Sequence, residues 1–159
     1  MLEIILVKSN EEYLIAQSLF KEYANWLNID LRFQQFDEEL KTLSSMYAFP
    51  YGGIILCRKD GEYAGCIAIR KIDTEIAELK RTYVRPSFQK QGIGNKLLQA
   101  AIDLAVNYKY KKIRLDTLSN MKEAINLYSR NGFYEIPAYY NNPQETAVYF
   151  EKKIAQDLG

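Results

Sequence analysis

A strand-like run, a loop with two glycines and an amphipathic helix follow one another in the middle of the chain. Residues 76–84 form the strand-like run, and Pro86 ends it. Residues 93–105 repeat apolar side chains every three or four positions, which is typical of a helix with one buried face. The loop between them carries Gly92 and Gly94. A buried strand that leads into a buried helix face predicts a sheet with this helix packed against it.

The flanking segments complete an α/β pattern. Ser9 and Glu12 form a capping box at the start of one predicted helix, and Asp60-Gly61 is typical of a hairpin turn. The other predicted strands are residues 2–7, 53–58, 63–69, 112–115, 133–136 and 147–151, and the other predicted helices run from Asp37 through Leu43 and from Met121 to Asn131. The order βααβββαβαββ predicts one domain over residues 1–159, with a mixed sheet and helices on both faces.

Composition excludes several kinds of chemistry. The 159 residues contain no histidine, which excludes Ser-His-Asp triads, Cys-His pairs and every metal site with a histidine ligand. The formal net charge of +1 does not favour nucleic-acid binding. Cys57 and Cys66 lie in apolar runs, as buried thiols of a reducing compartment do. Since neither a secretory signal nor a membrane span is evident, we expect a cytoplasmic protein that binds no membrane and no metal.

The glycine loop has the features of a phosphate site. A helix begins with unpaired N–H groups and a positive dipole end, and Gly92 and Gly94 let the main chain approach a ligand closely. The Walker A spacing is absent. A dinucleotide fingerprint lacks its third glycine because position 97 is Leu, but Asp116 resembles the acid that binds a ribose. A dinucleotide-dependent oxidoreductase and a purely structural turn therefore stay open as alternatives.

The wider context of this loop resembles one enzyme family. The pattern Q-x-x-G-x-G after Val84-Arg85-Pro86 is similar to motif A of the GNAT N-acetyltransferases. Residues 78–84 resemble the family's fourth strand, and residues 120–128 followed by Asn131-Gly132-Phe133 resemble its motif B. The resemblance implies the GNAT fold, a central, mostly antiparallel sheet. Gln89 departs from the pattern, because the family more often has Arg there.

The resemblance implies acetyl-CoA as acyl donor, with its pyrophosphate on the main-chain amides of residues 89–95. It also implies that the pantetheine arm pairs with Tyr83 and Val84, where the fourth strand splays away from residues 115–117, and that an N–H near Val84 polarises the acetyl carbonyl. The residues expected to bind the donor are Tyr83, Val84, Gln89, Lys90, Gln91, Gly92, Ile93, Gly94, Asn95, Lys96 and Asn120. For Asn120, capping of the helix that follows is the alternative.

The implied reaction is direct attack of an amine on the thioester, which needs a proton acceptor and a proton donor. Tyr128 matches the motif B tyrosine, and we assign it the acid role. Glu78, on the fourth strand, is the candidate base, with Asp116 or a water chain as alternatives. A non-catalytic acyl-CoA sensor with the same cradle is the other open function.

The acceptor is the least determined partner. Aromatic side chains with a few polar groups favour a small-molecule pocket, and the residues expected to line it are Phe33, Phe36, Tyr139 and Asn142. Small polar amines or amino acids are the first expectation, and a protein N-terminus or lysine is the second. A homodimer is left open, since self-association is common among GNAT proteins.

Overall fold

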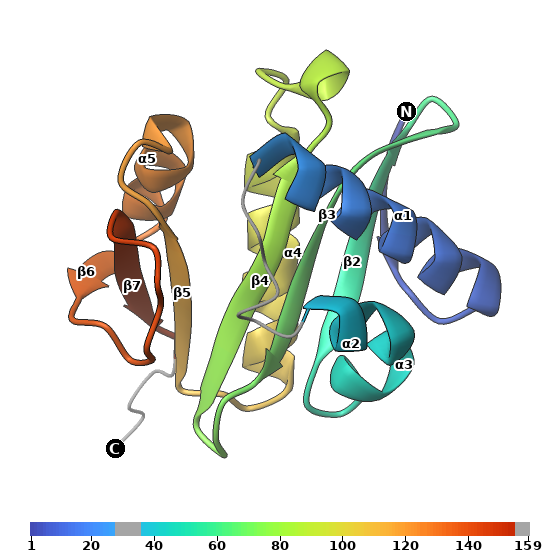
Figure 1. Cartoon of the computed structure of the whole chain (residues 1–159). Coiled ribbons are helices and arrows are strands. Elements are labelled where there is room, and N and C mark those ends of the chain that lie inside the picture. The colour runs from blue at the N-terminus through green and yellow to red at the C-terminus, as the bar shows by residue number, and fades with distance from the viewer. Residues whose placement is uncertain (28–35, 155–159) are drawn as a thin grey trace.

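The computed structural model describes residues 1–27 and 36–154, which form a sheet covered by helices (Figure 1). Its strands are β1 (Leu2–Leu6), β2 (Gly53–Lys59), β3 (Glu62–Lys71), β4 (Ile76–Val84), β5 (Lys112–Leu118), β6 (Tyr134–Ile136) and β7 (Ala147–Lys153). Its helices are α1 (Asn10–Leu27), α2 (Phe36–Lys41), α3 (Leu43–Met46), the 3-10 turn η2 (Pro86–Phe88), α4 (Ile93–Asn107) and α5 (Lys122–Arg130).

The seven strands lie in the order β1-β2-β3-β4-β5-β7-β6. Every neighbouring pair is antiparallel except β4 and β5, which run parallel. These two strands pair only from Ile76 to Glu78 against Lys112 to Arg114, and beyond that point they diverge (Figure 1). The mixed, mostly antiparallel sheet and the splay between its fourth and fifth strands are therefore confirmed.

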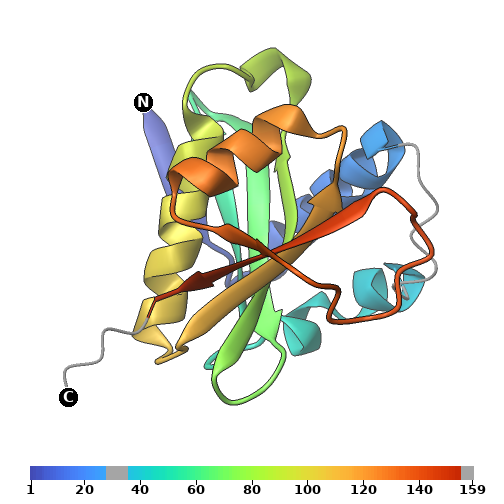
Figure 2. The same cartoon turned by 90° about the vertical axis from the view of Figure 1, so that its left-hand side faces the viewer.

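Each face of the sheet has its own core, because side chains alternate along the strands. On one face, Ile55, Ile67 and Leu79 pack with the apolar stripe of α4. On the other face, Leu56 and Cys66 pack with residues of α1, α2 and α3. Figure 2 shows α4 and α5 on one side of the sheet and α1, α2 and α3 on the opposite side.

Several local predictions are confirmed. The Glu12 N–H donates to Ser9 Oγ (3.1 Å), and the Ser9 N–H donates to Glu12 Oε1 (3.0 Å), as a capping box requires. Asp60 and Gly61 both have positive φ (50° and 86°) at the hairpin turn. Both cysteines are free thiols and buried.

The predicted helix from Asp37 through Leu43 is wrong in its extent. It ends at Lys41, and a separate short helix begins at Leu43. Thr42 causes the break, because its φ of −129° lies outside the helical range and its hydroxyl donates to the Glu38 carbonyl (2.8 Å). The strand predicted over 112–115 is longer and reaches Leu118.

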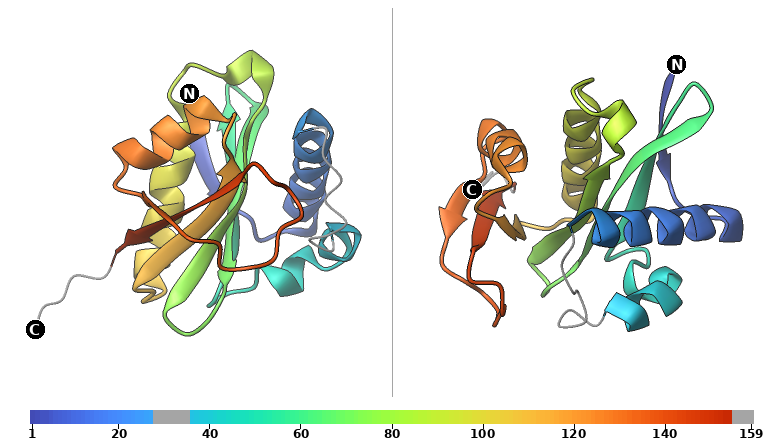
Figure 3. Two further views of the ribbon diagram at one scale, coloured as in Figure 1. Left: turned by 60° about the vertical axis from the view of Figure 1, so that its left-hand side comes forward. Right: turned by 45° about the horizontal axis from the view of Figure 1, so that its top comes forward.

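The segment between β6 and β7 reaches round the end of the sheet. Figures 2 and 3 show it extending toward the side that α1, α2 and α3 cover. It brings Tyr139 and Tyr140 next to residues of β4. None of the helices in the described part of the chain has the length and hydropathy that a bilayer crossing requires.

Candidate active site

The splay of β4 from β5 is the centre of the site. From Leu79 onward, the edge of β4 that faces β5 makes no strand pairing with it. A β-bulge interrupts β4 in the same stretch, where the register with β3 shifts and Arg81 adopts a φ of 58°. Two cavities share this strand, one at residues 82–84 and one at residues 78–80.

The first cavity, the donor cleft, has a volume of about 390 Å³ and meets the N-terminus of α4. Gly92 caps this helix with a φ of 80°, and no side chain bonds to the helix end. The Lys96 N–H donates to the Gly92 carbonyl (3.2 Å) and makes the first hydrogen bond of the helix. The main-chain N–H groups between Gly92 and Lys96 therefore have no carbonyl acceptor within the helix. Since the first turn also lacks acidic residues, this end of the helix is suited to an anion.

Most of the residues predicted to bind the donor line this cleft. They are Tyr83, Val84, Gln89, Lys90, Gly92, Ile93, Gly94, Asn95 and Asn120. Gln91 and Lys96 are exposed and are not among the lining residues; Gln91 instead accepts a hydrogen bond from Lys59. Asn120 precedes Met121, the N-cap of α5, and the cap makes no side-chain hydrogen bond.

Gln89 has a specific contact. Its side-chain amide donates to the Val84 carbonyl (3.0 Å), which ties the loop to the end of β4. The glutamine therefore contributes a loop anchor where an arginine would contribute charge.

Several cleft residues were not predicted to bind the donor. Trp26 reaches the cleft from α1, and Arg130 reaches it from the last turn of α5. Trp26 also packs on Tyr83, with 5.8 Å between ring centroids. Arg130 had a weak signal, because it lies two helical turns after Lys122, which lines the same cleft.

Tyr128 lies beside the cleft and is only 5% exposed. Its neighbour Leu127 and its contact partner Thr82 are lining residues, whereas Tyr128 is not. Burial raises the pKa of the Tyr128 phenol, an interaction with the Thr82 side chain lowers it, and the nearby Asp116 raises it further. A phenol with a raised pKa stays protonated near neutral pH, as a proton donor must.

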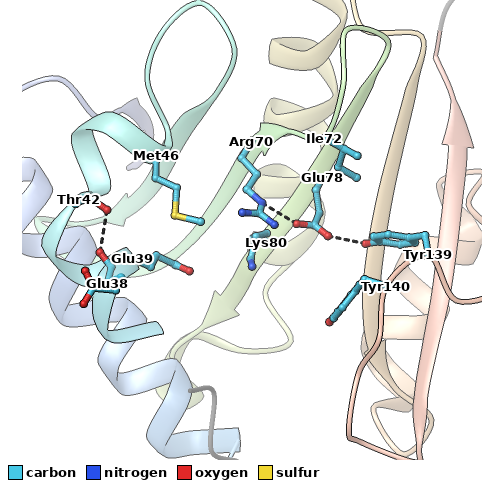
Figure 4. Close-up of a pocket in the computed structure, with 10 residues that line it drawn as sticks. All are labelled: Glu38, Glu39, Thr42, Met46, Arg70, Ile72, Glu78, Lys80, Tyr139 and Tyr140. Atoms are coloured by element: carbon cyan, nitrogen blue, oxygen red, sulfur yellow. Dashed lines mark hydrogen bonds and ion pairs between the residues drawn. The ribbon is translucent and has the colours of Figure 1, made fainter. Parts of the chain in front are cut away.

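The second cavity, the acceptor cavity, has a volume of about 540 Å³ and combines charged and aromatic side chains (Figure 4). Its lining residues are Glu38, Glu39, Thr42, Met46, Arg70, Ile72, Glu78, Lys80, Tyr139 and Tyr140. Behind it, the buried Arg81 donates to both oxygens of Glu39 (2.9 and 2.7 Å). Burial raises the pKa of Glu39, but the hydrogen bonds and charge of Arg81 outweigh it and hold the pKa below the usual range.

Two carboxylates near the splay differ in their contacts. Glu78 is 3% exposed and accepts from Arg70 Nε and from the Tyr139 hydroxyl, each at 2.8 Å on a different oxygen. Among the described residues, Asp116 accepts on one oxygen only, from Tyr140 (2.7 Å) and Asn142 (3.3 Å). Burial raises the pKa of Asp116, and the Tyr140 hydrogen bond offsets part of that effect.

The residues predicted to bind the acceptor fall in different places. Tyr139 lines the acceptor cavity, and Asn142 supports Tyr140 through a hydrogen bond to its hydroxyl oxygen (3.0 Å). Phe36 is 9% exposed and packs in the core under the Arg81 guanidinium, outside the cavity lining. Phe33 lies outside the described residues.

Comparison with known proteins identifies the family and supports the fold. The sequence profile of the acetyltransferase (GNAT) family matches residues 20–133. The chain belongs to the GNAT family. An uncharacterised N-acetyltransferase of Schizosaccharomyces pombe is 30% identical over 157 residues, with 98% of this chain and 96% of that protein covered. GNAT membership identifies the protein as an acyl-CoA-dependent acetyltransferase, and this sets the oxidoreductase alternative aside.

Solved GNAT structures share the architecture. A Klebsiella pneumoniae protein described as an acyl-CoA N-acyltransferase superposes with a TM-score of 0.77 at 28% identity, covering 98% of this chain and 99% of that one. A Thermoplasma acidophilum N-acetyltransferase in complex with coenzyme A has a TM-score of 0.74 at 20% identity, covering 96% and 99% of the two chains. The second likeness shows that this GNAT chain shares its fold with a protein that binds coenzyme A.

Proposed function

We propose that this GNAT enzyme transfers the acetyl group of acetyl-CoA to the primary amine of a small molecule. One observation carries the proposal. The N-terminus of α4 and the end of β4 line the donor cleft at the β4–β5 splay, and the acceptor cavity lies on the same strand. Complexes of related folds with coenzyme A and with acetyl-CoA support the choice of donor.

The donor cleft fits a diphosphate followed by an extended arm. The main-chain N–H groups that follow Gly92 would hold the pyrophosphate, since a Cβ at Gly92 would meet nothing within 4 Å and the cradle is open. Lys90 and Arg130 add positive charge. The exposed main-chain edge of β4 up to Val84 would hold the arm. Acetyl-CoA supplies an acetyl group already activated as a thioester.

Proton transfer needs an acceptor for the ammonium proton and a donor for the thiolate. Asp116 fits the acceptor role, because one of its oxygens accepts no hydrogen bond from the described residues and its raised pKa makes it a better base than an ordinary carboxylate. Glu78 remains the alternative, with both oxygens engaged by Arg70 and Tyr139. The buried phenol of Tyr128 is the proposed acid.

The acceptor cavity supports a small molecule. Its volume of about 540 Å³ lies in the range of small-ligand sites, and tyrosines from the β6–β7 segment close one side of it (Figure 4). A protein N-terminus or lysine side chain is the second acceptor class, to be tested in the same assay.

The test has two parts. Acetyl-CoA is expected to raise the melting temperature by several degrees, while NAD leaves it unchanged. Thiol release is then followed across a panel of amino acids, small polyamines, aminoglycosides and short peptides. Stabilisation by NAD alone would refute the proposal, and acetyl-CoA binding without turnover on any amine would favour the acyl-CoA sensor.

A further inference from the structure

Lys80 lines the acceptor cavity without a hydrogen-bond or ion-pair partner among the described residues (Figure 4). Each carboxylate of the cavity wall already has a cation of its own: the pairs are Lys41–Glu38 (3.8 Å), Arg81–Glu39 (2.7 Å) and Arg70–Glu78 (2.8 Å). The wall therefore carries one positive charge in excess of these pairs, and that charge is Lys80.

The bulge in β4 explains how the excess arises. Ala77 and Leu79 point into the core on the α4 side, while Glu78 and Lys80 line the cavity on the other face. Regular alternation would turn the next residue back toward α4. The register shift and the positive φ at Arg81 keep it instead on the side of α2, where it binds Glu39. Lys80 and Arg81 thus lie on the same face of β4, and Glu39 pairs with Arg81 but not with Lys80.

The environment of Lys80 disfavours its charge. Burial lowers the pKa of Lys80 to about 8, and the neighbouring Arg81 contributes to the same shift. The charged groups that face Lys80 come from four elements: Arg70 on β3, Glu78 and Arg81 on β4, Glu39 on α2 and Asp116 on β5. An ammonium group held in such a wall without a partner is unfavourable for folding and is typical of a ligand site.

Arg70 offers a second set of donors at the same wall. Its Nε donates to Glu78, and its side chain is 36% exposed. The two terminal nitrogens of Arg70 make no hydrogen bond to the described residues. A planar guanidinium edge beside an ammonium group is suited to a carboxylate.

We propose that Lys80, assisted by Arg70, binds a carboxylate of the acceptor, so that the substrate is an amino acid or a closely similar aminocarboxylate. This inference rests on the proposed function, because it assigns the ligand of the same acceptor cavity. The substrate carboxylate would neutralise the charge of Lys80. The amine of the substrate would then be free to face the splay.

The experiment compares acceptors in matched pairs, each an amino acid and its own carboxamide, by thiol release from acetyl-CoA. Lys80→Gln is expected to lower kcat/KM at least tenfold for the amino acids and less than threefold for the carboxamides. The ratio between variant and wild type cancels the different basicity of the two amines. Lys80→Arg is expected to retain most of the preference, and Lys21→Gln, an exposed lysine on α1, should change nothing. Melting curves of each variant confirm that it is folded.

An equal loss on both members of each pair would overturn the inference while acetyl transfer itself stands. If acetyl-CoA does not bind at all, the proposed function fails, and calorimetric titration of the same amino acids into the protein decides the inference alone. Binding that Lys80→Gln weakens tenfold supports the carboxylate site, and absence of binding refutes it.

Discussion

The donor cleft and the acceptor cavity share β4, but main-chain groups form one and side chains form the other. The cleft presents main-chain N–H groups at the start of α4, and its key position is a glycine with a φ of 80°. The cavity presents side chains from α2, β3, β4 and the β6–β7 segment, held by ion pairs such as Arg70–Glu78. A main-chain site depends little on side-chain pairing, whereas in a site of buried charges each charge that lacks a partner lowers the stability of the fold.

This difference has a consequence for mutation. Changes in the cleft should alter binding with little effect on stability, since helix N–H groups persist in any variant that keeps the loop conformation. Changes in the cavity should alter stability and acceptor choice together, because the same side chains do both. Five predictions separate the two behaviours.

The largest effect is expected from Glu39→Gln. Glu39 and Arg81 are 2% and 5% exposed, and Glu39→Gln removes the negative charge that both hydrogen bonds from the buried guanidinium reach. We expect a loss of about 3–5 kcal/mol in the free energy of unfolding, measured with denaturant at pH 7. Because the folded pKa of Glu39 is lowered, the wild-type advantage should exist above the unfolded value near 4.5 and disappear as the pH falls through the folded value. Glu38→Gln, an exposed neighbour, is the control, and a loss below 1 kcal/mol for Glu39→Gln would contradict the role of the pair.

Next in size is Gly92→Asp in the donor cleft. The new carboxylate would lie in open space beside the α4 N-terminus and repel a diphosphate. We expect calorimetry to show acetyl-CoA affinity reduced about 100-fold, or about 2.7 kcal/mol. Gly92→Asn is the matched control, because both residues tolerate positive φ and only one is charged. Equal losses for the two variants would mean that shape, and not charge, governs this loop.

Tyr128→Phe separates chemistry from binding. Removing the phenol should lower kcat about 100-fold, at the lower end of the range of general acid catalysis, while the Kd for acetyl-CoA stays within twofold. Tyr110→Phe is a control at a buried tyrosine whose hydroxyl instead donates to the Tyr51 carbonyl (2.6 Å). Weaker acetyl-CoA binding with unchanged kcat would remove Tyr128 from the acid role.

The two carboxylates near the splay are distinguished by their pH profiles. With Asp116 as base, its raised pKa places the acid limb of kcat/KM above the ordinary carboxyl range, and the rate falls as the pH drops through it. Asp116→Asn should lower kcat/KM about 30-fold and abolish that limb. Glu78→Gln should keep the limb and raise the KM for the acceptor, because it releases Arg70 and Tyr139. The reverse pattern would assign the base to Glu78.

The same contrast explains what the sequence could predict. The loop at the donor cleft was predictable because its residues are contiguous: a strand, Gly92, Gly94 and a helix stripe determine a main-chain geometry locally. The capping box at Ser9 and the hairpin at Asp60-Gly61 were predictable for the same reason. Arg130 was missed because its role depends on how α5 packs beside α4.

The acceptor cavity depends on contacts between distant residues, and sequence patterns do not encode these directly. Glu39 and Arg81 are 42 residues apart, and Glu78 and Tyr139 are 61 apart. Phe36 was expected in the pocket, but the neighbouring Glu38 and Glu39 line it, because Phe36 points into the core. The bulge at Arg81 contains no glycine that would indicate it in the sequence. The position of Lys80 and Arg81 on the same face therefore could not be predicted.

The smallest expected effect is an increase in the free energy of unfolding in Lys80→Met. It tests whether the acceptor cavity, unlike the donor cleft, loses stability in order to bind its ligand. The folded pKa of Lys80 is about 8, below its ordinary value of 10.5, so the folded protein binds this proton less tightly than the unfolded chain does. The charged lysine therefore destabilises the fold below pH 8, and this penalty fades as the pH rises toward 10.5. We expect Lys80→Met to raise the free energy of unfolding by about 1–2 kcal/mol at pH 7, with a smaller gain above pH 10.5.

Lys21→Met, at an exposed position on α1, should leave stability unchanged at every pH. A gain in Lys80→Met that accompanies loss of the preference for amino acids would show stability given up for acceptor recognition, as in other strained sites. Gly92→Asn should show no such exchange, because the donor cleft binds through groups that the helix exposes in any case. A loss of stability in Lys80→Met would mean that the lysine supports the cavity wall, and the two sites would then differ in composition but not in how function constrains them.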